Sequence, residues 1–169
     1  MNSNRKNCLI ELVGTFILVY AIVAAATVYS ESDQLGVIGI GLVHAFVLTA
    51  IVYAIGYKSG AHVNPAVTIA FIVTKRMKIR IGIFYIVSQV LGGIIAAAVV
   101  FAMFGLEITS SVTRPADGNV LRAFILEIVM TFTLVYVILT TAATKSNKIE
   151  SLAGIAIGFT LGFNVILGG

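Results

Sequence analysis

One polar stretch between two strongly apolar segments constrains this chain more than any other feature. Residues 59–68 read Ser-Gly-Ala-His-Val-Asn-Pro-Ala-Val-Thr. Asn64 is a good N-cap and Pro65 suits the first helical position, so a helix should begin here. The basic run that starts at Lys75 limits this helix to about ten residues, or ~15 Å, which is about half of a ~30 Å hydrocarbon core. The sequence therefore predicts a half-helix that begins near the middle of a membrane and ends at its surface.

A broken segment of this kind is tolerated in a bilayer only where its backbone is buried in protein or lines a water-filled cavity. The positive end of the half-helix dipole would point into that cavity and disfavour cations there. The Asn64 side chain can form hydrogen bonds with a neutral solute. The carbonyl groups of residues Gly60 to Val63, Ala61 among them, can form a row of acceptors that leads to it. This pattern favours a site for a small uncharged polar molecule. The alternative is a surface loop in which Asn64 and Pro65 merely cap a short amphipathic helix.

The composition is that of a polytopic membrane protein. Of 169 residues, 59% are hydrophobic and only 11% are charged, and the mean hydropathy is +1.07, which separates the chain from soluble domains. Nothing in it suggests catalysis, so we expect neither an enzyme nor a cofactor. The single cysteine, Cys8, excludes an intrachain disulfide and argues against a thiolate metal cluster, and its simplest role is that of a small buried residue.

Five apolar runs of nearly the ~20 residues needed to cross a membrane are predicted spans: residues 8–29, 35–57, 81–104, 120–143 and 152 to the end. If the spans alternate, nine of the eleven basic residues fall on one side, which is the positive-inside pattern and puts the N-terminus in the cytosol. We take the plasma membrane as the default location, and we expect no nucleic-acid partner. The nine are Arg5, Lys6, Lys58, Lys75, Arg76, Lys78, Arg80, Lys145 and Lys148, and the other two are Arg114 and Arg122.

An internal repeat runs through the chain. Residues 11–22 match residues 127–138 at eight of twelve positions, and the second span corresponds to the fifth. A repeat unit with an odd number of spans requires the second copy to enter from the opposite side, as in many channels and transporters. We therefore predict one transmembrane domain over residues 1–169, with repeat one at 1–105 and an incomplete repeat two at 118–169. Because the second copy lacks its own break, half-helix and third span, we expect a fragment of a design of about 230 residues.

Small residues recur every four positions on the second and fifth spans. Such stripes let two backbones approach closely in a membrane, so these two spans are predicted to meet along them. The stripes are Gly41, Ala45 and Thr49 on the second span and Gly154, Gly158 and Gly162 on the fifth.

Polar residues inside the spans are the remaining candidates for function. Glu11 and Glu127 occupy equivalent repeat positions, where a carboxylate is expensive in lipid. We favour a structural role, in which each accepts hydrogen bonds from the irregular backbone before a half-helix, over a proton relay. His62 is expected to hold the same backbone. His44 stands alone in an apolar run, ~12 Å from the outer end of its span, and either packs there or forms a polar constriction. One histidine cannot make a metal site.

Several of these segments resemble the aquaporin, or major intrinsic protein, family. Residues 59–67 are similar to the first Asn-Pro-Ala loop of the family, residues 11–16 to its first span, and residues 127–132 and 158–169 to its fourth and fifth spans. The resemblance implies an all-α membrane protein with the aquaporin-like inverted repeat, of which this chain has five spanning helices and one half-helix. It further implies a passive channel in a lipid bilayer for water or small neutral solutes, with one pore per protomer and assembly as a homotetramer.

The resemblance also implies roles for single residues. By position, Asn64, Pro65 and Ala66 match the first pore motif, His44 matches the second-span member of the outer selectivity filter, and Val165 matches the fifth-span member. A histidine with an aliphatic partner resembles the tonoplast-intrinsic type, which implies water and also ammonia. Glycerol is less favoured, since glycerol facilitators usually carry tryptophan at the His44 position. The second Asn-Pro-Ala, the filter arginine and the sixth span are not in the sequence, so the chain alone is expected to be an incomplete pore.

Two other functions stay open at this point. A secondary transporter can share inverted repeats and broken helices, and Glu11 and Glu127 are then the only candidates for a coupling-ion site. A non-conducting membrane protein that assembles with partners would need no second half-helix.

Overall fold

The computed structural model describes residues 3–29, 36–115, 118–143 and 151–168, and every regular element in these ranges is a helix. Residues 30–34 and 144–150, which separate predicted spans, lie outside the described residues, as do Asp117 and Gly169. The elements are α1 (Ser3–Tyr29), α2 (Gly36–Ser59), α3 (Pro65–Val73), α4 (Ile79–Phe104), the short 3₁₀ helix η1 (Gly105–Ser111), α5 (Val120–Thr141) and α7 (Ala153–Gly168).

The helices match the predicted spans and half-helix closely. Within the described residues, four segments are long and apolar enough to cross a membrane: α1, α2, α4 continued by η1, and α5. The fifth predicted span is represented by α7, which has 16 residues. The half-helix is α3, with nine residues.

The segment between the predicted spans at 81–104 and 120–143 begins as a helix. Gly105 ends α4 with a φ of +60°, and η1 follows directly. Hydroxyl groups stabilise this tight turn, because Thr109, Ser110 and Ser111 each donate to the carbonyl three residues earlier, at 2.7–2.8 Å. Such local side-chain bonds are the usual reason why serine and threonine favour short non-α turns. Further along the same segment, the Gly118 N–H donates to the Pro115 carbonyl at 3.1 Å.

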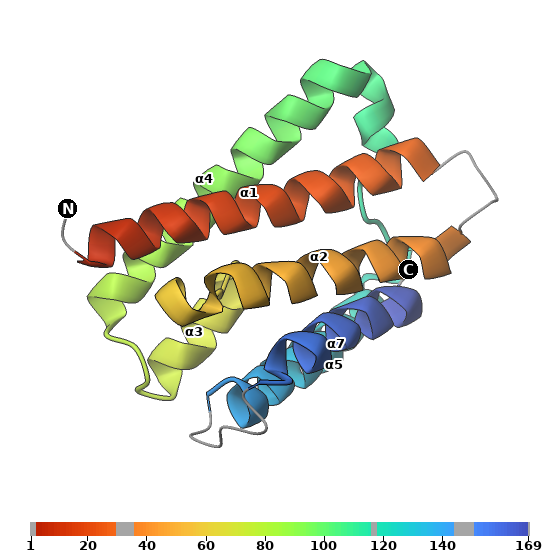
Figure 1. The fold of residues 1–169 in the computed structure, drawn as a ribbon. Helices are drawn as coiled ribbons and strands as arrows, with labels where there is room; N and C mark the ends of the chain where they lie inside the picture. Colours follow the sequence, from red (N-terminus) through yellow and green to blue (C-terminus); the bar gives the residue numbers. More distant parts are fainter. Residues whose placement is uncertain (1–2, 30–35, 116–117, 144–150, 169) are drawn as a thin grey trace.

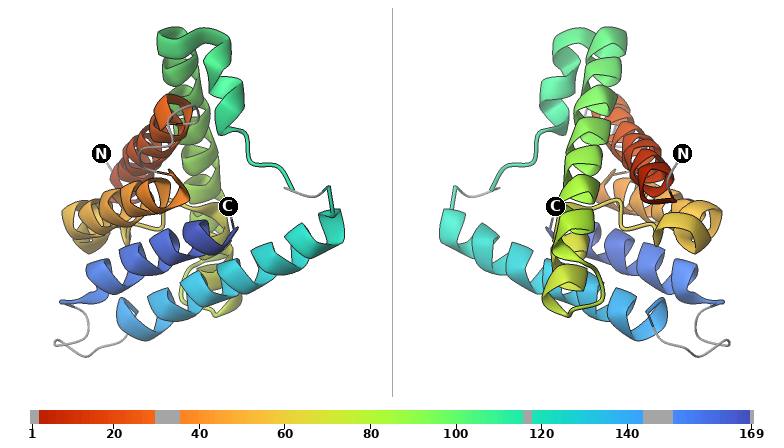
Figure 2. Two further views of the ribbon diagram at one scale, coloured as in Figure 1. Left: turned by 90° about the vertical axis from the view of Figure 1, so that its right-hand side faces the viewer. Right: turned by 90° about the vertical axis from the view of Figure 1, so that its left-hand side faces the viewer.

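The helices form one bundle in which each helix contacts two or three others. α1 packs against α2 and α4, α2 packs against α7, and α7 lies between α2 and α5 (Figures 1 and 2). The half-helix α3 contacts α4 and α5. The repeat is visible in detail: Phe16 stacks on Tyr20, and their equivalents Phe132 and Tyr136 stack in the same way, each pair with ring centroids 6.0 Å apart.

The predicted stripes of small residues do meet, along α2 and α7. A Cβ added at Gly162 would lie 2.7 Å from the Gly41 carbonyl oxygen, and one added at Gly158 would collide with the Ala45 carbonyl and the Thr49 hydroxyl. The contacts pair the early residues of α2 with the late residues of α7, so the two helices run antiparallel (Figure 1). This is the relation that an inverted repeat requires.

A second close approach joins α1 and α4. Gly92 faces α1, and a Cβ there would collide with the carbonyl oxygen of Leu12 and lie 3.1 Å from the backbone nitrogen of Phe16. At the adjacent Gly93, the nearest atom would be a Val19 methyl group at 3.8 Å, an ordinary contact.

These neighbours provide a matched test of the α1–α4 contact. Gly92→Ala should lower the stability of the protein by about 1–3 kcal/mol, because the added methyl group overpacks a backbone contact. Gly93→Ala should be neutral or stabilising, because alanine is the better helix former. Thermal unfolding of both variants in detergent measures the difference, and equal midpoints would contradict the close approach.

Candidate functional site

The break between α2 and α3 carries strained backbone. Gly60, Ala61 and Val63 have φ values of +93°, +47° and +39°. A positive φ is easy for glycine but unfavourable for alanine and more so for the β-branched valine. Each non-glycine residue with such a φ raises the free energy of the folded chain by about 1–3 kcal/mol, and the conformation persists only where the surroundings fix it.

The carboxylate of Glu11 on α1 fixes this backbone. Its Oε1 accepts hydrogen bonds from the Ser59 hydroxyl at 2.6 Å and from the His62 backbone N–H at 3.1 Å. Its Oε2 accepts from the Val63 backbone N–H at 2.7 Å and from the Gln89 side-chain amide at 2.9 Å. Glu11 is fully buried, with 0% exposure. Glu11 thus accepts hydrogen bonds from the irregular backbone before the half-helix, and charge-assisted bonds of this kind are the strong ones.

A second set of buried polar groups supports the break from α3 and α4. The His62 imidazole Nδ1 lies 3.1 Å from the Thr68 hydroxyl, which also accepts from the Gln89 amide at 2.9 Å. The His62 ring packs on Phe71, with centroids 4.3 Å apart. Tyr85 donates its hydroxyl to the Ser59 carbonyl at 3.0 Å. His62 thus contacts the surroundings of the break through its ring as well as its backbone.

Sequence reasoning missed Thr68, Tyr85 and Gln89 as parts of this support. All three are buried, and Gln89 is 1% exposed. A signal was present for Gln89, because it is the only amide in the apolar run 81–104. Polar side chains inside spans commonly form hydrogen bonds between helices.

Asn64 caps the half-helix in the predicted way. Its φ and ψ of −152° and 127° are extended, and its Oδ1 accepts from the Ala66 backbone N–H at 2.8 Å. Pro65 occupies the first helical position, where no N–H is needed. The Asn64 amide nitrogen donates to no described residue, so its two N–H groups are available to a solute.

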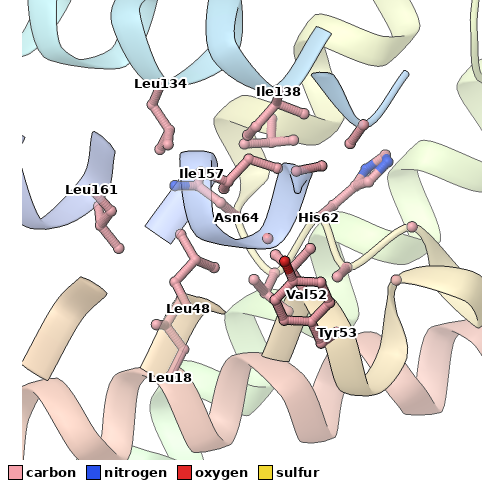
Figure 3. A pocket seen from close by; sticks show the side chains of 18 of the residues that line it. Leu18, Leu48, Val52, Tyr53, His62, Asn64, Leu134, Ile138, Ile157 and Leu161 are labelled. Carbon is pink, nitrogen blue, oxygen red and sulfur yellow. The ribbon is translucent and has the colours of Figure 1, made fainter. Parts of the chain in front are cut away.

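Two cavities meet at Asn64. One, of about 770 Å³, extends along the break and contains Gly60, Ala61 and His62 in its lining; Figure 3 shows Asn64 there among aliphatic side chains of α2, α5 and α7. The other, of about 620 Å³, lies towards η1 and the start of α5 and includes Glu127. Both are lined by Ile22, His44, Asn64, Leu134, Leu161 and Val165; we call this shared lining the waist and the two cavities together the passage.

The structure thus brings most of the predicted site residues together. His44, Asn64 and Val165 lie at the waist, whereas Pro65 and Ala66 line neither cavity and start the half-helix instead. The ring nitrogen Nδ1 of His44 lies 2.8 Å from the Ile40 carbonyl oxygen. Since a carbonyl only accepts, Nδ1 carries the proton and Nε2 is the nitrogen left to bind a solute.

Charge is scarce along the passage. The described lining of the larger cavity has no charged side chain, and the smaller cavity has Arg114 and Glu127. Glu127 is exposed, unlike its repeat equivalent Glu11. Among the described residues, no group of three or more His, Cys, Asp or Glu side chains is placed to hold a metal ion.

Comparisons with known proteins agree with this architecture. The family model of the major intrinsic proteins matches residues 1–169, and the chain therefore belongs to the major intrinsic protein family. Together with its apolar helices, this makes it an integral, multi-pass membrane protein.

Similar proteins include several plant proteins, among them aquaporins of the NIP and TIP types. Nodulin-26 of Glycine max is 42% identical over 161 residues, which cover 94% of this chain and 59% of that protein. Aquaporin NIP1-2 of Arabidopsis thaliana is 38% identical, with 94% and 56% covered. A probable aquaporin of TIP type from Medicago truncatula is also 38% identical, with 97% and 68% covered. The chain thus spans a little over half the length of the first two relatives.

A solved structure shows the same fold. The aquaglyceroporin from Plasmodium falciparum superposes with a TM-score of 0.78 over 97% of this chain and 71% of that one, at 18% sequence identity. At this identity, the likeness concerns the fold alone.

A substitution that keeps the size of the Glu11 side chain but removes its charge tests whether the carboxylate holds the break. Glu11→Gln replaces one acceptor oxygen with an amide donor that faces buried N–H and O–H groups, so it should destabilise the protein by about 1–3 kcal/mol. Thermal unfolding in detergent measures the loss. Glu107→Gln, at an exposed position of η1, makes the same chemical change and should have almost no effect. Similar midpoints for both variants would show that the carboxylate does not hold the break.

Proposed function

We propose that this chain forms the solute pathway of a passive channel for water and small neutral solutes. The observation that carries the proposal is the position of Asn64 at the waist between two cavities. Its side-chain oxygen is used by the Ala66 N–H, which leaves the amide N–H groups as donors for a passing solute. Water and ammonia both carry a lone pair that can accept such a bond.

The geometry also explains why ions would be rejected. The N-terminus of α3 begins at Asn64, and the positive end of a helix dipole disfavours cations. The described waist offers an ion no charged side chain, and losing hydration without a replacement is costly. Gly60 and Ala61 line the larger cavity, where their carbonyl groups could lead a neutral molecule towards Asn64.

His44 and Val165 are proposed to set the width of the waist. One polar imidazole opposite an aliphatic side chain suits water and ammonia better than a bulkier polyol. The position of His44 in both cavity linings supports the polar constriction over simple packing.

We further infer that a complete pore needs more than these residues. Glu127 is proposed to support a second break, as Glu11 supports the first, and the 169 residues alone would then form an incomplete pore. Assembly as a homotetramer, a cytosolic N-terminus and a plasma-membrane location complete the proposal. A secondary transporter receives less support, because Glu11 is buried and engaged by four donors.

Asn64→Asp tests the role of the amide. Aspartate caps a helix as well as asparagine does, so α3 should still form. The variant loses the N–H donors and adds a negative charge at the waist. One lost hydrogen bond of about 1 kcal/mol corresponds to about a fivefold fall in water permeability, measured by osmotic shrinkage of proteoliposomes that contain the complete protein.

Asn119→Asp is the matched control for this experiment. Asn119 caps α5 by accepting from the Arg122 N–H at 3.0 Å, and it lines neither cavity. Its substitution should leave permeability unchanged. If the Asn64 variant conducts like the parent, or if the parent shrinks no faster than empty vesicles, the proposed pathway is wrong. A flux that responds to an imposed proton or sodium gradient would favour the transporter.

His44→Ala tests the waist separately. Removing the imidazole should widen the passage, so glycerol uptake into proteoliposomes should rise relative to water permeability. Phe46→Ala serves as the control, because Phe46 lies two residues further along α2, is 61% exposed and lines neither cavity. An unchanged ratio of glycerol to water permeability in the His44 variant would show that His44 does not limit solute size.

A further inference from the structure

A compact group of positive charges lies where α3 ends and α4 begins. Four of the six residues 75–80 are basic, and all four are exposed. We refer to Lys75, Arg76, Lys78 and Arg80 as the cationic turn. Because α4 is a membrane-spanning helix that begins at Ile79, the cationic turn lies at the membrane surface.

The backbone holds the cationic turn in one conformation. The N–H groups of Arg76 and Met77 both donate to the Phe71 carbonyl, at 2.8 and 3.0 Å, and Lys75 N–H donates to the Ile72 carbonyl at 3.0 Å. Lys75 has a φ of +59°, which closes the chain back on α3. Little backbone entropy is then lost when an anion binds here.

Most of the charge on the turn is unused within the molecule. Arg76 donates to the Ala143 carbonyl at 2.8 Å, which ties the turn to the end of α5. Within the described residues, no hydrogen bond or ion pair engages the side chains of Lys75, Lys78 and Arg80. Three cations on a fixed turn without a counter-charge produce a local positive potential.

Exposed aliphatic side chains flank these charges on the membrane side. Val73 is 73% exposed, Ile79 66% and Ile83 54%. Ile79 lies between Lys78 and Arg80 in the chain, whereas Val73 precedes Lys75 by two residues and Ile83 follows Arg80 by three. Cations beside an apolar surface match the two parts of a phospholipid, which are its anionic headgroup and its acyl chains.

We propose that the cationic turn is a binding site for an anionic phospholipid. The headgroup phosphate and carboxylate contact Lys75, Lys78 and Arg80, and an acyl chain lies along Val73, Ile79 and Ile83. The occupied leaflet is the one that faces the basic side of the protein. This site is independent of the passage through Asn64, although Phe71, whose carbonyl closes the turn, also lines the larger cavity.

Lipid retention measures this binding directly. The complete protein in neutral detergent is titrated with phosphatidylserine or phosphatidylcholine, and bound lipids are counted by native mass spectrometry. We expect phosphatidylserine to be retained about tenfold better, because each nearby cation attracts an anionic lipid. Lys75→Gln with Arg80→Gln should remove most of that preference without altering water permeability through the passage.

Arg5→Gln with Lys6→Gln is the matched control, since it removes one arginine and one lysine that are also exposed and on the same side by the predicted topology. It should retain the preference for phosphatidylserine. If this control loses as much of the preference for phosphatidylserine as the turn variant does, the attraction comes from the overall positive charge of this side and the proposal is overturned. Equal retention of both lipids by the parent, or displacement of phosphatidylserine by inorganic phosphate in the millimolar range, would also overturn it. The lipid counts do not depend on permeability, so a failure of the proposed channel function would leave this test of the lipid site valid.

Discussion

The structure depends on one buried carboxylate. Removing an ionised group from water costs several kcal/mol unless its hydrogen bonds are replaced. Glu11 meets this condition with four donors from three parts of the chain: the end of α2, the break itself and α4. The same four bonds hold Val63 and its neighbours in a backbone conformation that they would not adopt alone. The cost of burying the charge and the strain of the break are thus offset by one set of contacts.

This support determines where the half-helix can begin. α1 brings Glu11 to the break, and α4 brings Gln89, which is possible only because Gly92 lets the two helices approach closely. The chain can therefore stop being helical inside a membrane with the N–H groups of His62 and Val63 paired to Glu11. Asn64 is then presented at the point where two cavities meet. The chemistry of the proposed pathway thus depends in part on α4, which contributes no residue to the lining of either cavity.

The two repeats share their helix packing but differ in the surroundings of their equivalent glutamates. α2 and α7 are equivalent and pack against each other along their small residues, and the stacked aromatic pairs of α1 and α5 have the same centroid distance. Glu11 is buried and fully engaged, whereas Glu127 is exposed beside the smaller cavity. The segment that Glu11 holds has no counterpart within the 169 residues. The chain covers a little over half of the length of its first relatives.

The sequence by itself determined the features that depend on neighbouring residues. Asn64 and Pro65 start a helix through local capping, apolar length sets the spans, and the repeat, with the spacing of its glycines, indicated which helices meet. Only the tertiary structure decided the partners of Glu11 on α4, the left-handed backbone at Ala61 and Val63, and the meeting of His44 with Val165. The physical reason is the distance along the chain over which each interaction acts. Capping and hydrophobicity act over a few residues, whereas a hydrogen bond between Glu11 and Gln89 depends on how two helices pack, which no local pattern specifies.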